Sequence, residues 1–182
     1  KILITDWHLA NVFIPVLSKL TKLLSLIASG EKPEIGIDAP INIENFEQVI
    51  FAEELLSPLV KIIPNDLAAL IYTSGSTGFP KGVMQTHQSM VFAAWSLIEY
   101  QRLSAQDRIL LVLPLAFDYG LYQLLMTMKL GATLIVERSF TFPALVYSRI
   151  REFEASVFPA VPTIFSMIIS SHKKKKLCFP SI

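Results

Sequence analysis

The chain has 182 residues, about the size of one domain, and could bury roughly 70% of its unfolded surface in a single core. Apolar residues make up 52% of it and charged residues only 17%, which is typical of a globular protein and excludes a disordered one. The formal net charge is +1, and Lys173 to Lys176 supply four of the 16 basic residues, so the rest of the chain carries no excess of positive charge. No surface for nucleic acid is therefore expected.

The apolar windows also exclude a membrane-spanning helix. Val83 to Ile98 and Ile109 to Met128 are interrupted by polar residues or proline, whereas a bilayer span requires about 20 uninterrupted apolar residues. The single cysteine, Cys178, excludes an internal disulfide framework and favours a cytoplasmic location. The histidines show no spacing with Asp, Glu or Cys that indicates a metal site or a catalytic triad.

The first part of the chain predicts two buried strands joined by a helix. Ile2 to Thr5 is a strand-sized apolar run, and Asp6 can cap the helix that follows. That helix has apolar residues at helical spacing from Leu9 to Leu20, and Pro15 should kink or split it. Leu23 to Gly30 is a second strand, and Glu31 to Asn45 is a loop or edge strand. Phe51 to Leu56 indicates a helical turn or two.

The second part alternates more regularly between strands and helices. The apolar run Leu67 to Tyr72 leads into a glycine loop, which is followed by a short strand or turn at Val83. Thr86 can cap a helix from about His87 to Tyr100, with Trp95 on its buried face. Further strands are expected at 109–113, 132–136 and 156–158, and helices at 121–130, 144–154 and 162–170. Gly131 should end the helix at 121–130. This alternation predicts an α/β fold with a mainly parallel sheet and helices on its faces.

The glycine loop "YTSGSTGFPKG", Tyr72 to Gly82, has the residues that hold a phosphate group. Glycines let the backbone approach an anion closely, Ser and Thr add hydroxyl donors, and lysine supplies a charge. Pro80 stands five residues after Gly75, where the Walker loop needs a glycine, so the spacing argues against a P-loop ATPase or GTPase. A flexible Ser/Gly connector is the alternative interpretation.

The longer segment "DLAALIYTSGSTGFPKGVMQTHQSM" closely resembles the signature of the AMP-forming adenylating enzymes. These are the acyl-CoA synthetases, the adenylation domains of peptide synthetases and the luciferases. The resemblance continues through "DRILLVLPLAFDYGLYQLLMTMKLGATLIVE" and "FPAVPTIFSMI", so it covers about Asp66 to Ile169. It implies that a carboxylate attacks the α-phosphate of ATP to form an acyl-adenylate and pyrophosphate, after which a thiol, with CoA as the favoured acceptor, takes the acyl group.

The resemblance also implies roles for the loop. The loop would wrap the β- and γ-phosphates of ATP, Lys81 would contact them electrostatically, and Thr77 would lie near the Mg²⁺ ion without any direct metal ligand being identified. The implied ATP-binding residues are Thr73, Ser74, Gly75, Ser76, Thr77, Gly78 and Lys81.

A second segment, "AFDYGLYQLL", follows the strand expected at 109–113 and lies where ligands bind α/β sheets. By resemblance it lines the acid pocket with Phe117, Asp118, Tyr119, Gly120 and Tyr122. Peptide-synthetase domains keep an aspartate at the position of Asp118 to pair with the α-ammonium group of an amino acid. Asp118 could instead simply cap a helix that begins near Tyr119. Tyr122 is expected to be a core or pocket-wall residue rather than a chemical group.

The chemistry of the family also depends on parts that are not recognisable here: a Tyr-Gly-x-Thr-Glu segment, a ribose-binding aspartate, a hinge and a small domain with a catalytic lysine. No catalytic residue is therefore identified. We expect residues 1–171 to be a partial large domain and 172–182 a Lys-rich tail, which could be a solvated tail, a nucleic-acid patch or out-of-frame sequence. The favoured interpretation is an acyl-CoA synthetase fragment that is inactive alone. An amino-acid-activating domain and a non-catalytic remnant are the alternatives.

Overall fold

The computed structural model describes residues 1–34, 36–37, 40–51, 60–73 and 78–172. The chain forms two compact units, Lys1–Val60 and Lys61–Ile182, rather than the single core that its length predicts. Among the described residues, no helix is both long and apolar enough to cross a membrane.

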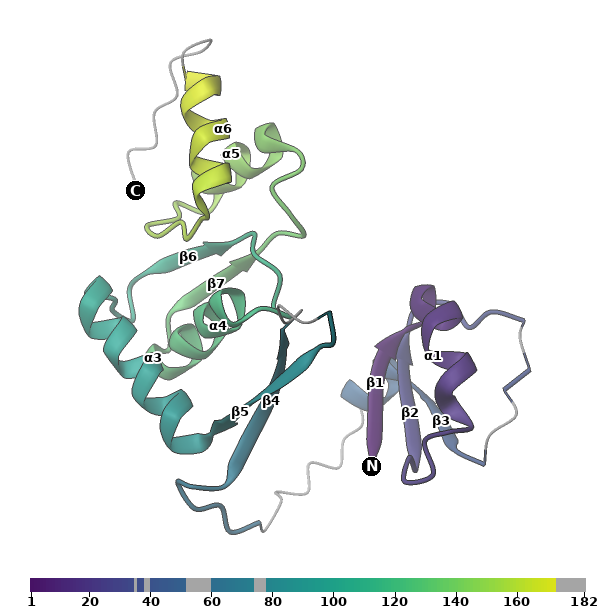
Figure 1. The fold of residues 1–182 in the computed structure, drawn as a ribbon. Coiled ribbons are helices and arrows are strands. Elements are labelled where there is room, and N and C mark those ends of the chain that lie inside the picture. The colour runs from purple at the N-terminus through teal and green to yellow at the C-terminus, as the bar shows by residue number, and fades with distance from the viewer. Residues whose placement is uncertain (35, 38–39, 52–59, 74–77, 173–182) are drawn as a thin grey trace. The chain divides into compact units, whose positions relative to one another are not determined.

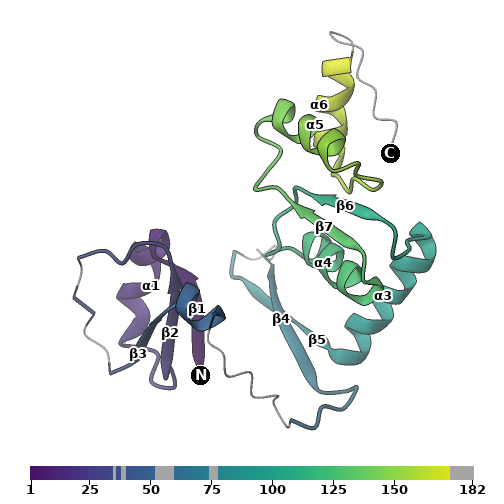
Figure 2. The ribbon, with the colours of Figure 1, turned by 180° about the vertical axis from the view of Figure 1, so that it is seen from behind.

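The first unit is a parallel three-stranded sheet with the order β1-β2-β3, covered by one helix (Figures 1 and 2). Its elements in chain order are β1 (Ile2–Asp6), the short 3-10 helix η1 (Trp7–Leu9), α1 (Ala10–Leu17), β2 (Ser25–Ser29), β3 (Asn42–Asn45) and α2 (Phe46–Ile50). The central strand β2 is the most buried because it pairs with β1 on one side and β3 on the other.

The core of this unit lies between α1 and the sheet. It contains Trp7, Ala10, Phe13, Leu17, Leu26 and Ala28. The expected helix is therefore confirmed, although it ends at Leu17 and continues through Pro15 without being split. The expected edge strand is β3, whereas the helical turn expected at Phe51 to Leu56 lies mainly outside the described residues.

The second unit begins with an antiparallel hairpin and continues with parallel strands and helices. Its elements are β4 (Leu67–Thr73), β5 (Lys81–Thr86), α3 (His87–Gln101), β6 (Arg108–Leu111), α4 (Asp118–Leu130), β7 (Thr133–Val136), α5 (Pro143–Glu152) and α6 (Pro162–His172). The hairpin β4–β5 departs from the mainly parallel pattern because a seven-residue connection can join antiparallel strands, whereas a parallel pair needs a longer crossover.

Strand β6 is the centre of the second unit because both of its faces are buried. Ile109 packs with Ala94, Ile98 and Met126 from α3 and α4, while Leu110 faces the cluster formed with α5 and α6. Figure 1 accordingly shows α3 and α4 on one side of β6 and β7, with α5 and α6 on the other. The strand expected at 156–158 is reduced to one bridge, between Val157 and Ile109.

The helix ends are formed as the sequence predicts. The Thr86 hydroxyl accepts the Ser89 N–H bond at 3.1 Å and the Ser89 hydroxyl accepts the Thr86 N–H bond at 3.0 Å, which is a complete capping box for α3. Gly131 ends α4 in the left-handed conformation with φ of 67°. The placement of Trp95 on the buried face was wrong, because the inward stripe of α3 runs through Ala94 and Ile98, and Trp95 is 46% exposed.

Candidate functional site

The glycine loop connects the two strands of the β4–β5 hairpin. Thr73 pairs with Lys81, and Tyr72 with Gly82. These are the pairs at the end of the hairpin that adjoins the loop. The Lys81 side chain is exposed, and Gly78 has φ of 82°, a conformation that favours glycine. Ser74, Gly75, Ser76 and Thr77 lie outside the described residues.

The segment with Asp118 forms the first turn of α4. Phe117 is the N-cap, so Asp118 is the first helical residue and not the cap that the sequence allowed. Its carboxylate nevertheless accepts the N–H bond of Tyr119 at 2.8 Å, and a negative charge here is favourable at the positive end of the helix dipole. This local bond and the helix dipole explain part of the role of Asp118 and leave its exposed carboxylate available to a ligand.

Hairpin and helix meet in one pocket of about 210 Å³, the Thr73–Asp118 pocket. Its walls are Ile71, Tyr72, Thr73, Val83, Gln85, Phe117 and Asp118. Two of the residues inferred for acid binding, Phe117 and Asp118, thus lie beside Thr73, which is next to the glycine loop. The remaining acid-pocket candidates, Tyr119, Gly120 and Tyr122, are not among the described residues that line it.

Each of these three residues lies elsewhere in the second unit. Tyr119 is exposed and Gly120 is buried against the segment that follows β6, where a Cβ atom would lie 2.3 Å from the carbonyl oxygen of Pro114. Tyr122 packs against the core between α3 and α4, as expected for a core residue. Burial, and secondarily the charge of Asp118, raise the pKa of the Tyr122 hydroxyl.

Sequence reasoning missed Ile71, Val83 and Gln85. The available signal was the pairing of the strands: Ile71 faces Val83 across the hairpin, and alternate residues of a strand share one face. Once the hairpin is recognised, Thr73 and Ile71 on β4 and Gln85 and Val83 on β5 are expected to line the same surface.

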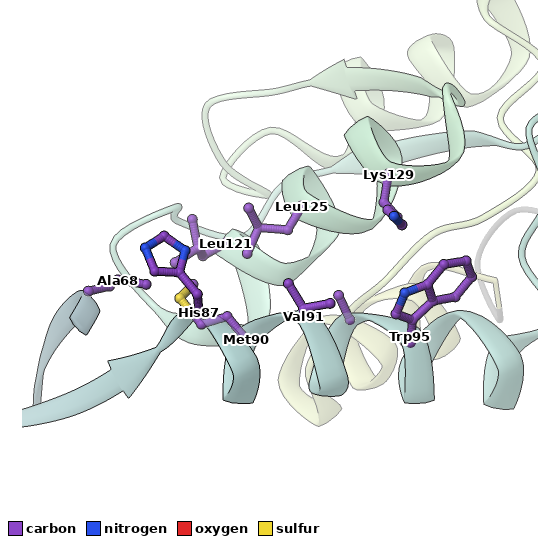
Figure 3. Close-up of a pocket in the computed structure, with 10 residues that line it drawn as sticks. Ala68, His87, Met90, Val91, Trp95, Leu121, Leu125 and Lys129 are labelled. Carbon is purple, nitrogen blue, oxygen red and sulfur yellow. The ribbon is translucent and has the colours of Figure 1, made fainter. Parts of the chain in front are cut away.

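A second and larger pocket, the α3–α4 groove, is lined by β4, α3 and α4 and has a volume of about 440 Å³ (Figure 3). Figure 3 shows Ala68 and His87 at one end of it and Trp95 and Lys129 at the other. Its walls are Ala68, Ala69, His87, Met90, Val91, Ala94, Trp95, Leu121, Leu125 and Lys129. His87 is the first residue of α3, as predicted.

The first unit has a polar cluster at the carboxyl end of its strands. Asp6 accepts a backbone bond from His8 at 2.9 Å, a hydroxyl bond from Ser29 at 2.7 Å and a contact from the His8 ring at 2.6 Å. The backbone bond from His8 chiefly, followed by the bond from Ser29, lowers the pKa of Asp6 to about 2. No group of three potential metal ligands occurs among the described residues of either unit.

Comparison with known proteins shows a match over nearly the whole chain. A model of the AMP-binding enzyme family matches residues 9–181. The chain is 32% identical to 4-coumarate–CoA ligase 3 of rice, Oryza sativa subsp. japonica, over 168 residues, which is 89% of the chain and 30% of that ligase. Over 73 residues it is 42% identical to a component of the linear gramicidin synthase of Brevibacillus parabrevis, covering 40% of the chain and 1% of that protein.

Comparison with solved structures also finds an extensive match. O-succinylbenzoate coenzyme A synthetase of Bacillus subtilis, in complex with AMP, superposes with a TM-score of 0.69 at 27% identity over 91% of the chain and 43% of that structure. The chain thus spans less than half of this neighbour and about 30% of the rice ligase.

Proposed function

Because the chain belongs to the AMP-binding enzyme family, we propose that it is part of the large domain of an ATP-dependent ligase that activates a carboxylic acid as an acyl-adenylate and transfers it to the thiol of CoA. The observation that carries this proposal is the Thr73–Asp118 pocket, in which the base of the phosphate loop and the first turn of α4 face the same space. Such a pocket can hold the carboxylate of an acid close to the phosphates that the loop would bind.

The residues present fit the phosphates of ATP. Lys81 provides one exposed positive charge at the loop end of the hairpin. The loop sequence from Thr73 to Gly78 provides hydroxyl and backbone donors. In the proposed reaction the acid carboxylate attacks the α-phosphorus, the bond to the bridging oxygen breaks, and pyrophosphate leaves. Lys81 would neutralise the charge that develops on this leaving group. Mg²⁺, with Thr77 near it, would add to the same neutralisation.

In the second step the thiolate of CoA attacks the acyl carbon, and the bond to AMP breaks. A cytoplasmic location is part of the proposal and rests on the single cysteine. Residues 1–171 are proposed as the partial large domain and 172–182 as a Lys-rich tail. We expect the 182-residue chain alone to show no adenylation, since it spans only about 30% of the rice ligase. Acid-dependent turnover by the purified chain would contradict this.

The test of the proposal is Lys81→Ala in a full-length enzyme that carries these residues. Loss of a charge that stabilises the leaving group should lower acid-dependent ATP–pyrophosphate exchange by about 10²-fold or more. Lys61→Ala, which removes another exposed lysine of the same unit, is the matched control and should leave the rate unchanged. Equal rates for the two variants would refute the role of Lys81.

A second candidate, activation of an amino acid for a peptide synthetase, is favoured by Asp118. The exposed carboxylate of Asp118 in the pocket would attract the ammonium group of an amino acid, a partner that a simple acid lacks. ATP–pyrophosphate exchange measured with amino acids and with fatty or aryl acids distinguishes the two candidate functions. Asp118→Asn should abolish exchange with amino acids but preserve it with simple acids.

A further inference from the structure

One edge of strand β7 has no neighbouring strand among the described residues. β7 pairs in parallel with β6 alone. The N–H groups of Thr133 and Glu137 donate to carbonyl oxygens on the β6 side, at 3.0 and 2.9 Å. Because the backbone groups of a strand alternate between its two edges, those of Leu134 and Val136 lie on the free edge. The donors and acceptors of these two residues can therefore pair with another strand.

A groove of about 430 Å³ follows this free edge. Five consecutive residues, Thr133 to Glu137, line the groove together with Arg108, Arg149 and Phe153. Neighbouring side chains of a strand point to opposite faces of the sheet, so a lining by five residues in succession means that the backbone itself borders the groove. Space for an added strand is therefore open along β7.

The sequence of β7 lacks the features that commonly protect an edge strand from pairing. Thr133–Val136 contains neither a charged residue nor a proline, and the Val136 side chain is 60% exposed. An added strand would cover Val136 and satisfy the backbone groups beside it. The free edge of β7 is thus a template for a strand of another molecule.

The charges at the two ends of the groove have opposite signs. Arg108 lies at one end, where it is the register partner of Thr133, and Glu137 lies at the other end. Glu137 pairs with Arg149 at 2.8 Å, whereas no described carboxylate forms an ion pair with Arg108. An antiparallel copy of β7 reverses this order, so its Glu137 would reach the end that holds Arg108. The edge is therefore complementary to itself.

We propose that the chain forms a twofold dimer in which the free edges of β7 from two copies pair antiparallel, with Ile135 opposite Ile135 of the second copy. In this register Leu134 exchanges both backbone bonds with Val136 of the second copy, and Thr133 lies opposite its Glu137. The twofold axis makes the contact closed, because each copy uses its edge once. This inference goes beyond the proposed function and does not depend on it.

The same register brings Arg108 and Glu137 of the second copy to one face of the joined sheet. Ile135 and Leu110 both belong to the core under α5, so Glu137 and Arg108, which alternate with them, face the same side. Their strands are two apart, a separation of about 10 Å between backbones. The long arginine side chain can bridge this separation, which favours a second copy over an uncharged segment as the occupant.

The experiment is sedimentation equilibrium of the 182-residue chain from micromolar to submillimolar concentrations. Wild type should show a monomer–dimer equilibrium. Val136→Pro removes an N–H group that a single copy does not use, so it should raise the dimer dissociation constant by about 10-fold or more and leave the circular dichroism spectrum unchanged. Val136→Thr keeps both the N–H group and a branched side chain, so this matched control should dimerise within about twofold of wild type.

Thr133 tests the register through charge. Thr133→Glu places a carboxylate opposite Glu137 of the second copy and should weaken the dimer, whereas Thr133→Lys at the same exposed position should preserve or strengthen it. This pair decides the question if Val136→Pro does not fold. The inference is overturned if wild type stays monomeric throughout, which would leave the edge to a different polypeptide. It is also overturned if the dimer survives a folded Val136→Pro, which would place the contact on another surface, or if the two Thr133 variants dimerise equally.

Discussion

Substitution of Gly120 by alanine tests how the first turn of α4 is held beside the pocket. A Cβ atom at this position would lie 2.3 Å from the carbonyl oxygen of Pro114, 2.8 Å from its carbonyl carbon and 2.9 Å from the carbonyl oxygen of Leu113. All three atoms belong to the backbone, so no side-chain rotation can relieve the contact. Either α4 or the segment that follows β6 must move.

The cost of this movement can be estimated from two opposing effects. Overpacking of a buried position costs about 1–3 kcal/mol. Alanine also regains about 0.5–1 kcal/mol relative to glycine inside a helix. The two ranges combine to a loss of about 0–2.5 kcal/mol, and because the contact is with backbone at 2.3 Å we expect Gly120→Ala to lower the free energy of unfolding by about 1–2 kcal/mol. Since Phe117 and Asp118 lie beside Gly120 at the start of α4, acid-dependent exchange by a full-length enzyme that carries these residues should fall as well.

The assay is urea unfolding of the chain in a Trp7→Phe background, in which Trp95 fluorescence reports only the second unit. Gly131→Asn is the control, because asparagine tolerates the left-handed conformation and no atom lies within 4 Å of the added Cβ. It should therefore destabilise the second unit less than Gly120→Ala does. If Gly120→Ala is as stable as this control, the close packing of α4 against Pro114 is incorrect.

Three further predictions concern stability. The pKa of Asp6 is about 2 in the folded protein, below its ordinary value of 3.8. The contribution of Asp6 to the free energy of unfolding should therefore be complete above about pH 3.8 and be lost as the pH falls toward 2. The stability difference between wild type and Asp6→Asn should shrink over that window in acid titrations followed by circular dichroism, and a constant difference would contradict it. Thr86→Ala removes the α3 capping box and should cost about 1 kcal/mol in urea unfolding, whereas Thr86→Ser should restore most of it. Ile150→Ala empties a fully buried site of the α5 core and should cost about 2–5 kcal/mol, against less than about 0.5 for the exposed Ser148→Ala.

Local signals in the sequence were sufficient to predict most of the helices and strands. The periodicity of apolar residues predicted α3 and α6 closely, and Thr86 and Gly131 marked the ends of helices because capping depends on residues only a few positions apart. The same signals failed for Phe117, which caps α4 without a side-chain bond, and for Trp95, since a shift of one residue on a helix turns a side chain by about 100°.

The sequence by itself determined the α/β class, the positions of the glycine loop and of the Asp118 segment, and the family to which they point. These depend on residue types at short spacing, which are local properties of the chain. Only the tertiary structure decided that Ile71, Val83 and Gln85 join Asp118 in one pocket and that Gly120 packs closely against the backbone of Pro114. These facts depend on how β4, β5, α3 and α4 pack, and packing brings together side chains whose separation along the chain carries no periodic signal.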